Sequence, residues 1–254
     1  MANTSRRSDF PEIIETPWRD FLDEFNELWL PGQHVSLIAP TGAGKTTFAN
    51  GIVSRRRYVV ALDVKGNDST LDSFGFHRLT TWPGAKTMSR TVLDNDYNGL
   101  ASRYVLGNPN RTEEDGRKLL RDIEHFLNDA WEMGGWTVYA DELMLLTDRR
   151  MMNLARKVDR MLVSARDRGI SFVSSYQAPT WVTPMAGKQS SWVAISYTRD
   201  VDVVNRLAEI LGRPKHEIRG AVKGLEPYCW IVAGNNPREP LRITMPDEIR
   251  KAST

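Results

Sequence analysis

Residues 35–47 read Val-Ser-Leu-Ile-Ala-Pro-Thr-Gly-Ala-Gly-Lys-Thr-Thr, a short apolar run followed by a glycine-rich segment that contains Gly-Lys-Thr. The segment fits the pattern of a phosphate-binding loop, with alanine where the first glycine usually stands. In such a loop, backbone N–H groups turn inward around phosphate oxygens, and the helix that follows points its positive end at them. The stretch therefore predicts a strand, a nucleotide-binding loop and a helix in succession.

The loop residues predict a site for ATP with Mg²⁺. Lys45 is expected to reach the β and γ phosphates, and the Thr46 hydroxyl is expected to bind Mg²⁺. A glycine-rich turn without a ligand is the alternative, which the position between a strand and a helix disfavours. The predicted ATP-binding residues are Pro40, Thr41, Gly42, Ala43, Gly44, Lys45, Thr46 and Thr47.

An acidic pair follows another apolar run. Residues 136–140 are predicted to form a strand, and Asp141 and Glu142 come directly after it. We expect Asp141 to hold Mg²⁺ through water, and Glu142 to orient and deprotonate the attacking water. An acidic loop start is the alternative for this pair on its own. Together with the phosphate loop, the pair predicts hydrolysis of ATP.

Three further residues are candidates for catalysis. Gln177 ends the strand predicted over 170–176, where its amide could sense the γ-phosphate or hold the water. Arg166 and Arg168 lie between the acidic pair and that strand, and one of them could reach the ATP of a neighbouring subunit as an arginine finger. An ordinary strand end and solvated arginines at a helix end are the alternatives.

Turn signals divide the whole chain into alternating strand and helix patterns, which predict an α/β fold with a mostly parallel sheet covered by helices on both faces. We expect a helical lead-in over residues 1–30 and an ATPase domain over 31–254 that ends in a hairpin of 228–232 with 241–244. Other predicted strands cover 58–62, 103–106 and 192–197, and 67–110 is read as an elaboration at the sheet edge. Other predicted helices cover 46–55, 112–131, about 150–167 and 201–211.

Composition narrows the class of protein. The chain has 254 residues, one cysteine, eight tryptophans and a net charge of +2 from 34 basic and 32 acidic residues. This balance of charge does not by itself indicate nucleic acid, and we expect the tryptophans to be core or interface anchors, with base stacking as the alternative. The single Cys229 cannot form an internal disulfide, and the polar start and the lack of a long apolar run predict no signal peptide and no membrane span. We expect a cytoplasmic protein.

The chain resembles the FtsK/HerA superfamily of ring-forming DNA pumps, in particular the small viral ATPases that package genomes. The resemblance rests on the phosphate loop, the Asp-Glu pair, Asp-x-Lys-Gly at 63–66, Arg-x-x-Gly-Ile at 166–170 before Gln177, and Thr-Arg-Asp at 198–200. It implies the strand order of RecA-like (ASCE) ATPases, with the glutamine strand between the phosphate-loop strand and the acidic strand. It also implies a homo-oligomeric ring, pentamer or hexamer, around double-stranded DNA.

Three functions remain open on the sequence. The leading one is a DNA-translocating ATPase that packages a viral genome in the host cytoplasm, docked on a capsid portal and without a membrane anchor. A protein-translocating or secretion-type ring ATPase shares the same core, whereas a small-molecule kinase would not need the Asp-Glu pair. Candidate DNA contacts in predicted loops, for which a solvated surface charge is the alternative, are Lys86, Arg90, Arg149, Arg150 and Lys188.

Overall fold

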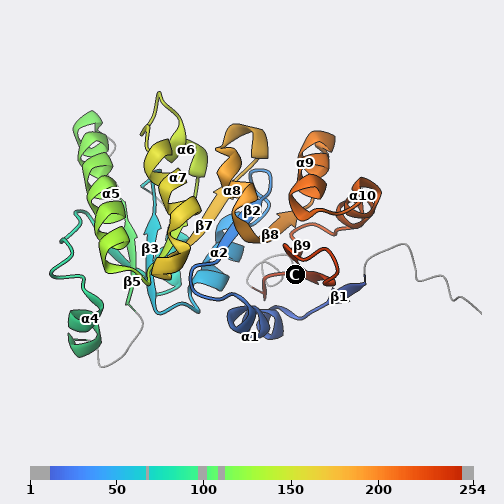
Figure 1. Ribbon diagram of the computed structural model, residues 1–254, viewed down its shortest axis with the longest axis horizontal. Helices are drawn as coiled ribbons and strands as arrows, with labels where there is room; N and C mark the ends of the chain where they lie inside the picture. The colour runs from blue at the N-terminus through green and yellow to red at the C-terminus, as the bar shows by residue number, and fades with distance from the viewer. Residues whose placement is uncertain (1–11, 67–68, 97–101, 108–111, 248–254) are drawn as a thin grey trace, which may run out of the picture.

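A computed structural model describes residues 12–66, 69–96, 102–107 and 112–247, and Figure 1 shows the arrangement of their helices and strands. The predicted polar start of the chain and parts of the 67–110 segment lie outside these residues. The remaining predictions about secondary structure can be compared with the structure directly.

The centre of the molecule is one ten-stranded sheet with the order β1-β10-β9-β8-β2-β7-β6-β3-β5-β4. Pairing is parallel throughout, except that β9 runs antiparallel to both β8 and β10. The glutamine strand β7 lies between β2 and β6, as the resemblance implied. The strands are β1 (Ile13–Glu15), β2 (His34–Ile38), β3 (Tyr58–Leu62), β4 (His77–Leu79), β5 (Ser102–Leu106), β6 (Thr137–Ala140), β7 (Ser171–Tyr176), β8 (Ser190–Ser196), β9 (Trp230–Gly234) and β10 (Leu241–Thr244).

Helices cover both faces of this sheet (Figure 1). One face carries α4 to α10, and the other carries α1, α2 and α3. The predicted fold class is therefore confirmed. The helices are α1 (Trp18–Leu28), α2 (Lys45–Val53), α3 (Ser69–Ser73), α4 (Arg90–Asp96), α5 (Glu113–Met133), α6 (Leu143–Thr147), α7 (Ala155–Ser164), α8 (Pro184–Lys188), α9 (Val201–Leu211) and α10 (Lys215–Lys223), with 3₁₀ turns at Arg166–Arg168 and Pro179–Trp181.

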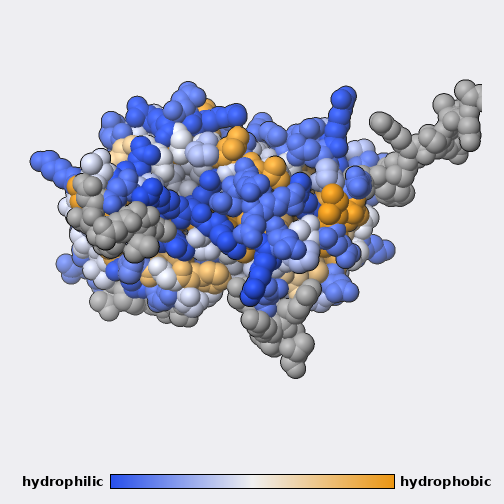
Figure 2. Space-filling model, turned by 90° about the horizontal axis from the view of Figure 1, so that it is seen from below, coloured by the Kyte–Doolittle hydropathy of each residue, from blue (hydrophilic) through white to orange (hydrophobic). Residues whose placement is uncertain are grey.

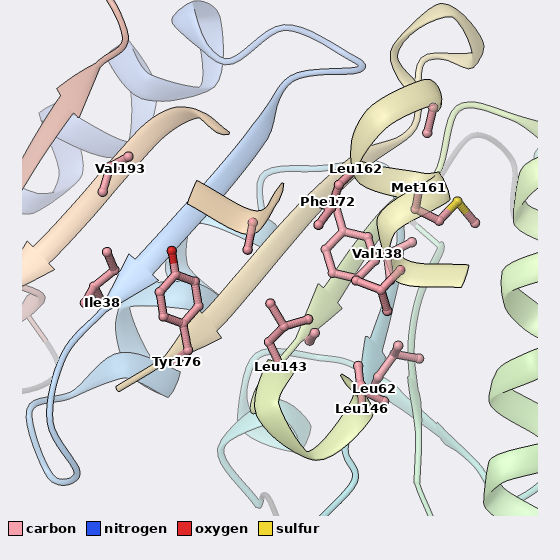
Figure 3. Packing of buried hydrophobic residues seen from close by; sticks show 14 of the residues in the cluster. Ile38, Leu62, Val138, Leu143, Leu146, Met161, Leu162, Phe172, Tyr176 and Val193 are labelled. Carbon is pink, nitrogen blue, oxygen red and sulfur yellow. The ribbon is translucent and has the colours of Figure 1, made fainter. Parts of the chain in front are cut away.

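The strands bury side chains on both faces because successive residues of a strand point in opposite directions. In β3, Val59 and Ala61 join the core beneath α1 and α2, whereas Val60 and Leu62 join the core beneath α5 and α7. Figure 3 shows part of the second core, where Phe172 of β7 packs with side chains of α6 and α7. This two-sided burial explains why the strands read as unbroken apolar runs.

Most predicted elements are present. Helix α5 begins at the predicted cap, where the Thr112 hydroxyl accepts a hydrogen bond from the Asp115 N–H, and it ends at Gly134. The predicted C-terminal hairpin is formed by β9 and β10, and β4 and β5 lie at the sheet edge as expected for the 67–110 segment. The predicted boundary of the lead-in at residue 31 stays a prediction, although α1 packs Trp18 and Phe21 against Phe48 of α2.

The prediction of one basic helix over about 150–167 is wrong. The structure has the short helix α6, a loop, the ten-residue helix α7 and a 3₁₀ turn instead. Asp148 accepts a hydrogen bond from the Arg150 N–H at 2.7 Å, and Asn153 has a φ of 53°, so the loop turns the chain before α7 can start. The sequence prediction also missed β1, whose three residues are too few to show a periodicity.

Most of the tryptophans lie in the core, and one face of the molecule is mostly polar. Six of the eight tryptophans are buried in the core, so base stacking is not their role, and Trp181 is 55% exposed. The face seen in Figure 2 is mostly hydrophilic, with hydrophobic residues in small separate areas. Among the residues that the structure describes, no helix is both long enough and apolar enough to cross a bilayer.

Candidate active site

The phosphate loop connects the carboxyl end of β2 to the first turn of α2. Gly42 and Gly44 both have left-handed backbone conformations, with φ of 81° and 79°, which residues with a side chain rarely adopt. The nine-residue helix α2 begins directly after them, at Lys45, so its positive end faces the loop. This geometry is the one that the residues of the loop predicted.

The loop borders a cavity of about 330 Å³ that the acidic pair also borders. Parallel strands β2 and β6 end at the same edge of the sheet, and only β7 separates them. Of the predicted ATP-binding residues, Pro40 and Ala43 do not line this cavity. Its lining consists of Thr41, Gly42, Gly44, Lys45, Thr46, Thr47, Lys65, Asp141 and Glu142.

The Lys45 ammonium lies over the start of its own loop. Its Nζ atom donates hydrogen bonds to the carbonyl oxygens of Ala39 at 2.7 Å and Pro40 at 3.0 Å. Burial lowers the pKa of the Lys45 amine, and the carboxylates of Glu142 and Asp141 partly oppose this effect. A lysine held here can exchange its carbonyl partners for phosphate oxygens by rotation of its side chain.

The two predicted Mg²⁺ ligands are already in contact. The Thr46 hydroxyl donates to Oδ1 of Asp141 at 3.2 Å, and the same oxygen accepts from the Tyr139 hydroxyl at 2.7 Å. Hard oxygen ligands of this kind suit Mg²⁺, which usually takes one or two protein groups and completes its shell with phosphate and water. In the described part of the chain, no cluster of three His, Cys, Asp or Glu residues is arranged to hold a metal ion.

Glu142 is buried beside the cavity and makes an ion pair that the sequence analysis did not assign. Its Oε2 atom lies 3.2 Å from Nζ of Lys65, which also lies 3.9 Å from Oδ2 of Asp141. Strands β3 and β6 are neighbours and pair Leu62 with Ala140, so the residues that follow both strands meet at the same level. The Asp-x-Lys-Gly motif was the available signal, but without the strand order it had no partner.

Gln177 follows β7 at the same edge of the sheet. Tyr176 pairs with Ile38 of β2, and the Ala39 N–H donates to the Tyr176 carbonyl at 3.3 Å. Gln177 is therefore level with the start of the phosphate loop, half-buried, although it is not among the residues that line the cavity. Its predicted role in sensing the γ-phosphate stays a prediction.

Arg166 and Arg168 lie at the opposite end of the parallel strands, before the start of β7. The six residues of β7 span about 20 Å at the usual rise per residue, so neither arginine can reach the phosphate loop of its own chain. Both are exposed. Arg168 donates to the Trp131 carbonyl at 2.9 Å, and its guanidinium lies 4.8 Å from the centroid of the Trp131 ring.

The candidate DNA contacts are all exposed, but they do not gather in one place. Arg90 begins α4, whereas Lys188 ends α8, and these helices lie well apart in Figure 1. Arg149 and Arg150 belong to the loop between α6 and α7. A single basic patch on one subunit is therefore not formed by these residues.

No protein-family profile matches this sequence, and no curated protein matches it. Solved structures do match its fold. The genome packaging NTPase B204 from Sulfolobus turreted icosahedral virus 2, in complex with AMPPCP, superposes with a TM-score of 0.58 and 15% identity over 86% of this chain and 100% of that chain.

Two further structures share the fold. VirB4 of Thermoanaerobacter pseudethanolicus has a TM-score of 0.58 and 10% identity, over 85% of this chain and 91% of that chain. The cytoplasmic domain of the Type VII secretion ATPase EccC from Thermomonospora curvata has a TM-score of 0.51 and 16% identity, over 84% of this chain and 25% of that chain. This chain therefore has the fold of an ASCE P-loop ATPase and resembles viral genome-packaging ATPases.

Proposed function

We propose that this chain is an ATP-hydrolysing motor that translocates double-stranded DNA to package a viral genome. The observation that supports the proposal is the single cavity in which the phosphate loop, the Thr46–Asp141 contact and Glu142 meet. A cavity that only bound nucleotide would need the loop but not the carboxylate of Glu142 at its border. The fold shared with P-loop ATPases supports the same reading.

The chemistry assigned to these residues is hydrolysis of the γ-phosphate. Lys45 and the N–H groups of the loop bind the phosphate oxygens. Thr46 and, through water, Asp141 would hold Mg²⁺, which would supply positive charge to the terminal phosphates. Water attacks the γ-phosphorus while the bond to the β,γ-bridging oxygen breaks, and Glu142 accepts the proton of the water. Gln177 orients that water or contacts the γ-phosphate. The products are ADP and inorganic phosphate.

The choice of DNA packaging rests on the extent of the structural likeness. B204, which is described as a genome packaging NTPase, is matched over its whole length, so little of that protein lies outside the fold shared with this chain. Assembly into a ring is part of the proposal, because Arg166 and Arg168 lie far from the ATP site of their own chain. In a ring these arginines can face the site of the next subunit, with DNA in the central channel and a capsid portal as the docking partner.

A secretion-type motor that moves a protein is the second candidate. The likeness to the Type VII secretion ATPase EccC favours it, since the catalytic core of the two motors would be the same. The two functions differ in the polymer that occupies the channel. Their separation therefore requires a test with that polymer present.

The experiment measures ATP hydrolysis with and without linear double-stranded DNA, together with particle mass in solution. We expect DNA to raise the rate several-fold and the effect to weaken as salt rises, since phosphate contacts release counterions. The Lys45→Ala variant serves as the control for a contaminating ATPase. If an assembled ring hydrolyses ATP at the same rate with and without DNA, the secretion-type motor is favoured. The absence of hydrolysis under all conditions would overturn the proposal.

A further inference from the structure

Lys65 is an exposed lysine that forms an ion pair with a buried carboxylate. Its side chain is 55% exposed, whereas the Glu142 side chain with which it pairs is 7% exposed. Lys65 and Lys45 line the same cavity, so two ammonium groups face the space where phosphates would lie. Lys65 is the more exposed of the two, and its long side chain can rotate without disturbing the core.

The backbone that carries Lys65 is held in place by a buried carboxylate. Asp63 is 1% exposed, and its Oδ1 atom accepts the Gly66 N–H at 2.8 Å while its Oδ2 atom lies 3.2 Å from Nη1 of Arg78. This closes a tight turn over 63–66 directly after β3. The turn fixes the backbone of Lys65 beside the cavity. The ion pair with Glu142 therefore depends on an ordered backbone position.

The ion pair conflicts with the work proposed for Glu142. Oε2 of Glu142 accepts a hydrogen bond from the Lys65 ammonium at 3.2 Å, so Lys65 occupies an acceptor position that the attacking water would need. ATP brings several negative charges into the same cavity, and its terminal phosphate can compete with Glu142 for Lys65. ADP lacks that phosphate and can compete far less.

We propose that Lys65 is a second ligand of the γ-phosphate, and that its transfer from Glu142 to this phosphate frees Glu142 to act on water. The inference rests on the proposed ATPase function. It adds that binding of the γ-phosphate in the cavity makes Glu142 available for hydrolysis. With the γ-phosphate absent, Glu142 is held by Lys65. With the γ-phosphate present, Lys65 binds the phosphate and Glu142 is released.

The first test compares affinities for Mg²⁺-AMPPCP and Mg²⁺-ADP by calorimetry, in the parent protein and in Lys65→Met, which removes the charge but keeps the length. We expect the affinity for AMPPCP to fall about 10-fold, as for loss of one charge-assisted hydrogen bond, and the affinity for ADP to change less than about 2-fold. Lys65→Arg keeps the positive charge and should retain the preference for AMPPCP. The matched control is Lys223→Met, at an exposed site in the last turn of α10.

The second test asks whether Lys65 and Glu142 compete. In Glu142→Gln the ion pair is already absent, so AMPPCP should bind more tightly than to the parent. For the same reason Lys65→Met should reduce AMPPCP affinity by a larger factor in the Glu142→Gln background than in the parent. A role confined to holding the structure together would shift AMPPCP and ADP affinities alike and would leave no such difference between backgrounds.

The outcomes separate this inference from the proposed function. An equal loss of affinity for AMPPCP and ADP in Lys65→Met, or a change of less than about 2-fold in the affinity for AMPPCP, would overturn the inference while Lys45→Ala still weakened the binding of both nucleotides. If Lys45→Ala also bound both nucleotides normally, the ATP site itself would be wrong. Circular dichroism of each variant shows whether the fold is intact.

Discussion

The Thr46 hydroxyl donates a hydrogen bond of 3.2 Å to Asp141, although 95 positions separate the two residues in the sequence. Asp141 is further held by the Tyr139 hydroxyl, so the two oxygen groups predicted to bind Mg²⁺ are oriented before any ligand enters. Prior orientation of this kind lowers the cost of assembling a site when the substrate binds.

Replacing Lys45 with alanine should weaken nucleotide binding without unfolding the protein. Among the described residues, the Lys45 side chain donates hydrogen bonds to two carbonyl groups of its own loop. Its loss should therefore change the free energy of unfolding by about 1 kcal/mol or less. Loss of its charge-assisted bonds to phosphate should weaken ATP binding by about 10- to 100-fold. Calorimetry with Mg²⁺-ATP and a thermal melt measure the two effects. Undiminished hydrolysis by this variant would refute the assignment of the loop.

Glu142→Gln should bind ATP and fail to hydrolyse it. The amide keeps the shape of the carboxylate but cannot accept a proton, and general bases contribute about 10²- to 10⁴-fold in rate. Phosphate release under saturating ATP measures the loss, and nucleotide affinity is the control. Turnover at the parental rate would mean that another residue is the general base. Gln177 cannot be that residue, because its amide is not basic.

Arg168→Ala should depress hydrolysis in the assembled protein while leaving ATP affinity nearly unchanged. Arginine fingers that act across subunits are worth about 10³ to 10⁵ in rate, whereas the stacking of Arg168 on Trp131 is worth about 1 kcal/mol of stability. Hydrolysis by the parent should rise more than linearly with protein concentration until assembly is complete. Arg166→Ala is the matched comparison within the same turn.

Mixing Arg168→Ala with Glu142→Gln tests whether the arginine acts in the neighbouring subunit. Some interfaces in the mixture would join an intact Glu142 to an intact Arg168, so activity should return in part. If the two variants co-assemble and every mixing ratio stays inactive, the arginine acts within its own chain or supports the structure. The outcome depends on subunit contacts and not on the fold of either variant.

Gly51→Ala should destabilise the protein although alanine favours helices. A Cβ atom at Gly51 would lie 2.3 Å from Cζ2 of Trp18, so α1 would have to shift away from α2, at a cost of about 1 to 3 kcal/mol. Gly116→Ala is the matched control within α5, because a Cβ there meets no atom within 4 Å and should stabilise by roughly 0.5 to 1 kcal/mol. Urea unfolding measures both. A Gly51→Ala protein more stable than the parent would refute the packing of α1 on α2.

The buried His34 should make the protein less stable in acid. Burial lowers its pKa to about 4 from the ordinary 6.5, and its Nδ1 atom accepts the Phe172 N–H while Nε2 lies 3.0 Å from the Leu162 carbonyl. The folded pKa is below the unfolded one, so the unfolded chain binds more protons between these values. The contribution of neutral His34 to the free energy of unfolding is therefore fully present above pH 6.5. It is lost as the pH drops from 6.5 towards 4, by on the order of 3 kcal/mol.

Unfolding by urea at steps between pH 7.5 and 4 measures this effect, and His34→Gln, which does not titrate, is the control variant. The difference in slope between the two proteins isolates the contribution of His34 from that of carboxylates. Identical slopes would show that His34 titrates normally in the folded protein. The variant is expected to be less stable overall, so only the slopes are compared.

The sequence predicted the parts of the site that depend on neighbours in the chain. The phosphate loop needs two glycines at left-handed positions and a helix start, and all of these lie within 42–45. The strands were predictable because burial on both faces leaves an unbroken apolar run. The false prediction of a helix from about 150 arose because helix-forming residues there are interrupted by the Asp148 turn and the left-handed Asn153, which no periodicity reveals.

Residues only a few positions apart in the chain set the conformation of the phosphate loop, the apolar strands and the capped helix α5. The tertiary structure alone decided which strand ends meet. The pairing of β3 with β6 places Lys65 3.2 Å from Glu142 across 77 positions, and the length of β7 places Arg168 at the edge away from the ATP site. The reason is physical: an ion pair depends on distance in space, and strand order sets that distance through hydrogen bonds between segments that are remote in the chain.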